Sequence, residues 1–149
     1  MVALLCLFAL LVLALPLAEA LLFALPGVVL HWTLEFLHHI GHAIAARHTG
    51  YPMQGIRFGM MGIVAMSVYP QDEPALPARI HIRRALGGPI ISASIGLVLL
   101  ALVVVAGDSA SLTAYLLRLG LFLCFMMSAG ALMPVPNLDG GTILYWARH

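Results

Sequence analysis

His38 and His42 are the pair of residues whose types and spacing could do chemistry. They stand four positions apart in an apolar stretch, so on a helix their imidazoles project from one face about one turn apart. That spacing lets two rings bind one metal ion and is half of a zinc site. Cys6 and Cys124 lie in apolar runs without metal-ligand spacing, and we interpret both as small buried hydrophobes.

The same stretch carries further ionisable side chains on one helix face. At about 100° per residue, five residues fall within a stripe about 100° wide: His31, Glu35, His38, His39 and His42. Ionisable groups at membrane depth are costly and nearly always point to a bundle interior or a water-filled cavity. The stripe is therefore a candidate functional site, and the alternative is that the histidines mark a wet helix end.

The composition indicates an integral membrane protein. Of the 149 residues, 62% are hydrophobic and only 9% are charged, whereas about 25% are charged in ordinary globular domains. Lipid must therefore be the solvent for most of the surface. The net charge is +1 without basic or acidic runs, so we expect no nucleic-acid partner. We predict a single all-α polytopic membrane domain over residues 1–149, with the lipid bilayer as its surroundings.

Four apolar segments are long enough to cross a bilayer: 1–25, 28–46, 86–106 and 112–133. Pro26-Gly27 separates the first two segments. The alternative for residues 1–20 is a cleaved signal peptide, because Ala18-Glu19-Ala20 matches a cleavage pattern. We favour a retained helix, since no Lys or Arg precedes the apolar run.

The polar connection over residues 47–84 predicts both a β segment and a membrane orientation. Residues 56–68 alternate small, apolar and β-branched side chains, which indicates one or two short strands. The connection also carries five of the seven arginines. By the positive-inside rule we place it and both termini in the cytoplasm, with Asp108 on the opposite side of the cell membrane.

Asp139 is a third candidate metal ligand. It follows the cytoplasmic end of the fourth predicted span, so it can reach the depth of His38 and His42. Three protein ligands would leave a fourth position on the metal for water. The alternative is that Asp139 belongs to an ordinary surface turn in an Asp-Gly-Gly sequence.

Four motifs in order resemble the site-2 proteases, which are membrane-embedded zinc metalloproteases. The segments that carry the resemblance are Leu37 to Gly50 (family pattern L-H-E-x-G-H-A-x-A-A), Gly62 to Met66 (G-G-V-A), Leu86 to Pro89 (A-G-P) and Pro134 to Gly141 (P-x-P-x-L-D-G-G). The resemblance implies a site-2 protease-like core with about four transmembrane helices. It also implies that His38, His42 and Asp139 hold zinc (Zn²⁺).

Two catalytic positions depart from the family pattern. The family's general-base glutamate falls on His39, and the asparagine that steadies the reacting carbonyl falls on Ala131. Losing a general base typically costs about 10²- to 10⁴-fold in rate, and losing an oxyanion donor about 10²- to 10³-fold. We therefore expect a pseudoprotease: a zinc metalloprotease-like membrane protein with weak or lost peptidase activity.

Three other functions stay open from the sequence. The chain could be an active intramembrane endopeptidase that cuts a substrate's transmembrane helix, with His39 or Glu35 as a substitute base. It could be a non-enzymatic protein that binds zinc or a client helix. It could also conduct metal ions or protons along the histidine stripe, although residues 86–106 offer only Ser92 and Ser94 to continue that stripe.

Overall fold

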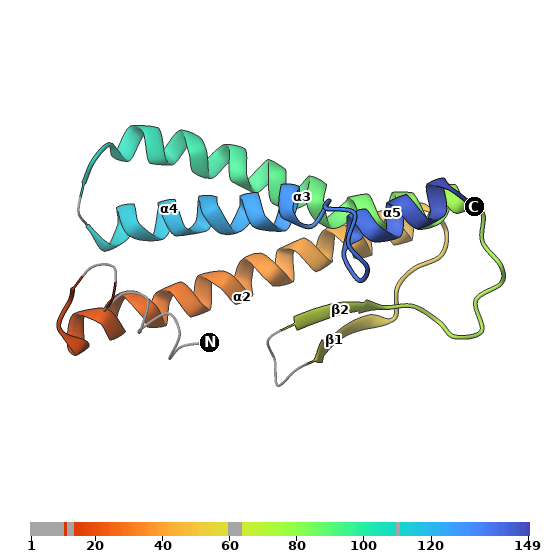
Figure 1. Cartoon of the computed structure of the whole chain (residues 1–149), viewed down its shortest axis with the longest axis horizontal. Coiled ribbons are helices and arrows are strands. Elements are labelled where there is room, and N and C mark those ends of the chain that lie inside the picture. Colours follow the sequence, from red (N-terminus) through yellow and green to blue (C-terminus); the bar gives the residue numbers. More distant parts are fainter. Residues whose placement is uncertain (1–10, 12–13, 60–63, 110) are drawn as a thin grey trace.

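The computed structural model describes residues 11, 14–59, 64–109 and 111–149. Their elements, in chain order, are α2 (Leu17–His48), β1 (Gly55–Gly59), β2 (Val64–Val68), α3 (Ala78–Ala106), α4 (Leu112–Phe125), the π-helical turn η2 (Met126–Gly130) and α5 (Asp139–Ala147). Helices α2, α3 and α4 lie side by side with alternating directions (Figure 1). The prediction of a mostly helical protein with a short β segment is confirmed.

Three helical segments of the described residues are long and apolar enough to cross a membrane: Leu17–His48, Ala78–Ala106 and Leu112–Gly130. Their outward faces stay apolar, and Val104 and Val105 near the end of α3 are 72% and 85% exposed. Water disfavours such a surface and lipid does not, so the prediction of an integral membrane protein is confirmed. Residues 1–10 and 12–13 of the predicted first span, 1–25, lie outside the described residues, and residues 17–25 belong to α2.

The predicted helix break at Pro26-Gly27 is wrong, because α2 continues through both residues. Proline removes one helical hydrogen bond, but helices in membranes tolerate this loss where neighbouring helices pack against them. Gly27 supplies that contact, since a Cβ atom there would lie 3.0 Å from Leu119 Cδ2 on α4.

Two other predicted boundaries also shift. Helix α3 begins at Ala78 instead of residue 86, so the Arg79 and Arg84 expected in a loop belong to its first turns. Pro77 precedes this helix, where its missing N–H leaves no helical bond unmade. The fourth predicted span, 112–133, ends at Gly130, where η2 ends and the chain turns.

The strands predicted within 56–68 form an antiparallel hairpin. Its register pairs Gly55 with Val68 and Gly59 with Val64. The hairpin lies along the second half of α2, on the side away from α3 and α4 (Figure 1).

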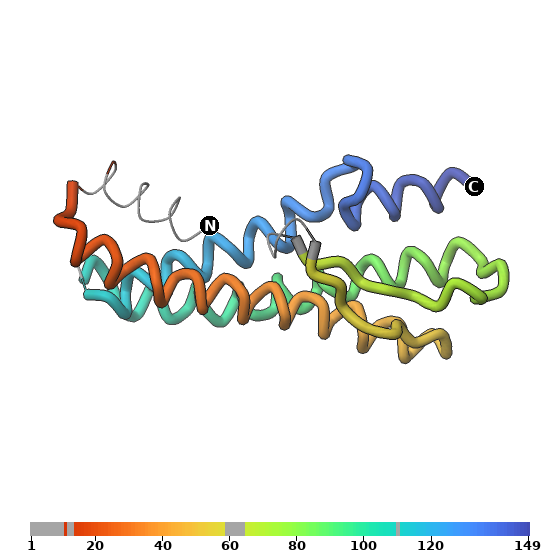
Figure 2. The backbone as a smooth tube through the Cα atoms, turned by 90° about the horizontal axis from the view of Figure 1, so that it is seen from below, coloured from red at the N-terminus to blue at the C-terminus, as the bar shows by residue number. Residues whose placement is uncertain are grey.

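The polar elements gather at one end of the helix bundle. The hairpin, the 69–77 connection and α5 all lie where α2 ends and α3 begins (Figures 1 and 2). The turn between α3 and α4, with Asp108, lies at the opposite end. This arrangement places the polar connection and the C-terminus together, whereas the cytoplasmic orientation remains a prediction.

A small apolar core holds the helices together in the middle of the bundle. Leu34, Cys124 and Met127 are buried there against one another. Cys124 is 1% exposed, as expected for a small buried hydrophobe. Cys6 lies outside the described residues.

Candidate metal centre

Helices α2 and α3 approach in direct backbone contact beside the histidines. A Cβ atom on Gly41 would lie 2.3 Å from the Gly87 carbonyl oxygen, and one on Gly87 equally close to that of Gly41. A Cβ atom on Gly88 would lie 2.4 Å from His42 Nε2 and 2.5 Å from His38 Nε2. Small residues let membrane helices pack this closely. The glycines before Pro89 therefore make the room that the two imidazoles occupy.

Asp139 reaches the histidines because the chain folds back sharply after η2. The Gly140 N–H donates a 2.9 Å hydrogen bond to the Ala131 carbonyl, which fixes the start of α5 against this turn. A Cβ atom on Gly140 would lie only 2.0 Å from the Leu132 carbonyl oxygen. The glycines after Asp139 thus permit a close backbone contact. Both glycines belong to the first turn of α5.

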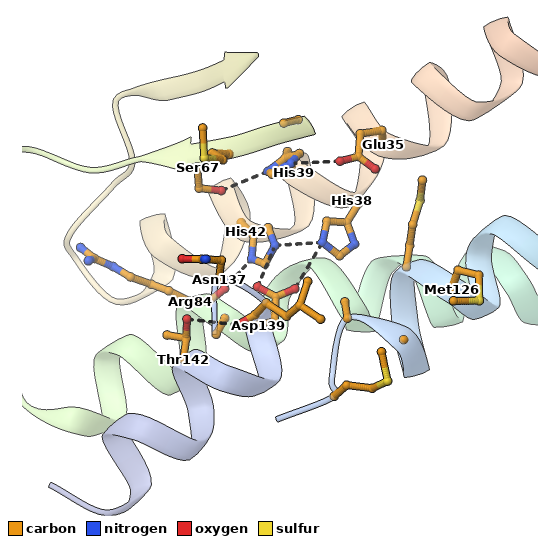
Figure 3. A pocket seen from close by; sticks show the side chains of 18 of the residues that line it. Glu35, His38, His39, His42, Ser67, Arg84, Met126, Asn137, Asp139 and Thr142 are labelled. Carbon is orange, nitrogen blue, oxygen red and sulfur yellow. Dashed lines mark hydrogen bonds and ion pairs between the residues drawn. The ribbon is translucent and has the colours of Figure 1, made fainter. Parts of the chain in front are cut away.

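The three predicted ligands converge in one cluster (Figure 3). His38 Nε2 and His42 Nε2 lie 3.1 Å apart. Asp139 Oδ2 lies 3.4 Å from His38 Nε2, and Asp139 Oδ1 lies 3.5 Å from His42 Nε2. His38 and His42 are 7% and 4% exposed. One ligand atom from each residue therefore faces a common, buried point.

Each imidazole is oriented by a second contact on α3. His42 Nδ1 lies 2.8 Å from the Arg84 carbonyl oxygen, and His38 Nδ1 lies 3.0 Å from Ser92 Oγ. Such contacts fix the ring and its tautomer in metal sites. Neither of these roles was predicted from the sequence. Ser92 could have been found, because it follows Gly88 by one helical turn and so shares the face that meets α2.

The donor set fits a zinc ion. His42 Nδ1 faces the Arg84 carbonyl oxygen, so Nε2 is the ring nitrogen turned toward His38 and Asp139. Burial by itself raises the pKa of the Asp139 carboxyl, but its hydrogen bonds with His38 and His42 outweigh this effect and hold that pKa below its usual range. Imidazole nitrogens and a carboxylate facing one point need a proton or a cation between them, and this combination of ligands is typical of zinc.

His39 lies outside this cluster, on the side of the hairpin. Its Nδ1 atom is 3.1 Å from Ser67 Oγ on β2, and its Nε2 atom is 3.6 Å from Glu35 Oε1 (Figure 3). The ring is 5% exposed, and its centroid is 5.5 Å from those of His38 and His42. His39 is therefore held by its neighbours at both ring nitrogens.

A cavity of about 520 Å³ adjoins the cluster. Glu35, His39, Ala131 and Asp139 are among its lining residues. Ala131, where the resemblance seen in the sequence implies an asparagine, is thus one of the lining residues. Methionines 66, 126, 127 and 133 supply much of the remaining wall.

The polar stripe of α2 does not extend along α3 beyond Ser92. Ser94 donates to the carbonyl of Ile90 in its own helix and is exposed. His31 packs against Trp32, with ring centroids 5.5 Å apart, and is not among the residues that line the cavity. These placements disfavour a conduit along the histidine stripe.

The fold and the cluster define a class: a membrane-embedded helical protein with a buried histidine, histidine and aspartate cluster beside a cavity. No protein-family model and no curated protein matches the chain. Among solved structures, the chain is similar to a site-2 protease from Methanocaldococcus jannaschii, with a TM-score of 0.56 and 26% sequence identity. The match covers 78% of this chain and 50% of that protein, so the chain spans half of its length. The fold is site-2 protease-like.

Proposed function

We propose that the chain is a zinc-binding membrane protein of the site-2 protease type whose peptidase activity is weak or lost. The observation that carries the zinc proposal is the convergence of His38, His42 and Asp139, with their donor atoms within 4.8 Å of one another. The solved site-2 protease supports the fold.

The proposal of weak activity rests on the residues around the cluster. A zinc ion held there would supply Lewis-acid polarisation and would balance the charge of Asp139. Peptide hydrolysis also needs a base that faces the reacting water, but the nitrogens of His39 already face Ser67 and Glu35. Ala131 offers no donor to a developing oxyanion. The residues present can hold the metal without supplying the two groups that catalysis needs.

Client binding is a second candidate function, and the cavity wall favours it. Met126 and Met133 beside the cluster are 43% and 49% exposed, although they are large apolar side chains. Thioether side chains are flexible and adapt to differently shaped apolar surfaces. A client's transmembrane helix is the partner whose chemistry matches this wall.

The zinc proposal is tested by elemental analysis of the detergent-purified protein. We expect about one zinc per chain in the wild type and a near-complete loss in His42→Ala and Asp139→Ala. His48→Ala and Asp72→Ala are matched controls, because both side chains are exposed and lie away from the cluster. Equal zinc content in the wild type and both cluster variants would refute the ligand assignment.

A further inference from the structure

The β1–β2 hairpin is attached to the bundle at its base by one buried arginine. Arg84 on α3 is 3% exposed and donates to the Glu73 carboxylate, with 2.9 Å from Nη1 to Oε2. Its Nη2 atom donates a 2.6 Å hydrogen bond to the Tyr51 carbonyl, and its guanidinium lies over the Tyr69 ring at 4.3 Å. Tyr51 precedes β1, whereas Tyr69 and Glu73 follow β2. One guanidinium therefore fastens both ends of the hairpin to α3.

The strands themselves are attached to α2 much more lightly. On β2, Ser67 Oγ forms the 3.1 Å hydrogen bond with His39 Nδ1. On β1, the Phe58 ring meets the Trp32 ring edge-on with centroids 5.5 Å apart, and Phe58 remains 55% exposed. A typical hydrogen bond contributes about 0.5–1.5 kcal/mol and an aromatic pair about as much. Separating the strands from α2 would break these two contacts and uncover Ala65, while the attachment through Arg84 stays in place.

Strand β2 forms one wall of the cavity beside the metal cluster. Ala65, Met66 and Ser67 line the cavity, and Ala65 is only 9% exposed. Figure 3 shows this strand alongside His39, with Asp139 and the two cluster histidines beyond it. Moving β2 away from α2, with its base still held by Arg84, would widen the cavity without disturbing the cluster.

We propose that the Ser67–His39 hydrogen bond is a latch that holds β2 against α2 and limits the access of a client's apolar segment to the cavity. Glu35 keeps the His39 ring turned toward the hairpin by facing its other nitrogen. The residue at the family's base position thus acts on the hairpin. The role of the cavity as a client site rests on the proposed function, whereas the latch concerns contacts within this chain.

The test measures how fast a maleimide reaches a thiol introduced by Ala65→Cys, in a Cys6→Ala background. Cys124 is retained, because its burial makes it an internal reporter of global unfolding. Ser67→Ala and His39→Phe should each raise the labelling rate at position 65 about threefold to tenfold, the range expected for one hydrogen bond. The two changes together should raise it no further, since both remove the same bond.

Two control variants make the outcome decisive. His39→Gln keeps a hydrogen-bonding group near Ser67 and should label at close to the parent rate. Ser94→Ala is the matched serine control, because that hydroxyl bonds only within α3. Unchanged labelling in Ser67→Ala, additive effects in the double variant, or parallel labelling of Cys124 would each overturn the latch.

Zinc content, measured on the same samples, separates the two proposals. Ser67→Ala should keep its zinc while labelling faster. A wild type without zinc that still shows the coupled labelling would refute the zinc site and leave the latch standing. Bound zinc together with uncoupled labelling would refute the latch alone.

Discussion

The two sides of the cavity differ in how tightly the fold specifies them. On the ligand side, His38 and His42 each have a second contact on α3, and Gly88 leaves no space for a Cβ atom. On the hairpin side, His39 contacts only side chains at its two ring nitrogens, Ser67 and Glu35.

The difference lies in what each side is made of. Backbone atoms of α2, α3 and the turn before α5 touch one another around the ligands, so a change there must move whole helices. The residues at positions 39 and 131 line the cavity instead, and the contacts of the His39 ring nitrogens are with side chains, which can adjust without moving a helix. Substitutions at positions 39 and 131 therefore leave the backbone contacts around the proposed ligands in place.

Supplying catalytic groups at positions 39 and 131 should produce the largest effect, which is a gain in substrate cleavage. We expect His39→Glu to raise cleavage of a transmembrane model substrate by at least about 10²-fold, because it supplies a base. Adding Ala131→Asn should raise cleavage further by supplying an oxyanion donor. The assay compares cleavage of a fluorogenic substrate with and without a zinc chelator.

Two outcomes would contradict that expectation. Robust chelator-sensitive cleavage by the wild type would mean that His39 or Glu35 already serves as the base. A double variant as inactive as the wild type would mean that the rest of the site no longer supports catalysis. Addition of His42→Ala to the double variant is the control, since it should abolish any activity gained.

Adding a methyl group beside the ligands should have the next largest effect, which is a loss of zinc affinity. In Gly88→Ala the added methyl would meet both Nε2 atoms, so at least one ring must move. Overpacking of this kind costs about 1–3 kcal/mol, and we expect zinc affinity to fall about 10- to 100-fold. A chromophoric chelator competition assay measures it. Gly55→Ala is the matched control, because a Cβ atom there meets nothing within 4 Å; equal affinities in both variants would contradict the packing argument.

The smallest effect concerns the base of the hairpin and its dependence on pH. The hydrogen bond from Arg84 lowers the pKa of Glu73 from its ordinary value of 4.5. A carboxyl with a lowered pKa stabilises the fold above its unfolded-state pKa, and this contribution is lost as the pH falls through the folded-state pKa. The wild type should therefore unfold about 2–4 °C above Glu73→Gln at pH 7, and the difference should shrink below about pH 4.5.

That prediction is checked by the pH dependence of the difference between the two unfolding temperatures in detergent. Taking the difference removes the effects of acid on the histidines, which both proteins share. Asp72→Asn is the control, since that carboxylate is exposed. A difference that persists unchanged to pH 3 would mean that the ion pair does not stabilise the hairpin base.

The sequence by itself determined the membrane setting, the presence of short strands within 56–68 and the identity of the three residues that converge. The composition indicates that lipid surrounds the protein, since this many apolar residues cannot all be buried within a chain of 149. The four-residue spacing of His38 and His42 fixes their common face, because helical geometry is local. These inferences depend only on neighbouring residues or on averages over the chain.

Tertiary packing decided the rest. Helix α2 crosses Pro26 because α4 supports it, and no local signal at Pro26-Gly27 reports that contact. The partners of His38, His39 and His42 come from residues 92, 67 and 84, which are distant in sequence. The packing of α3 on α2 decides that the Nε2 atoms of His38 and His42 face the cluster. The packing of β2 on α2 decides that His39 faces the hairpin, so only the folded chain determines these orientations.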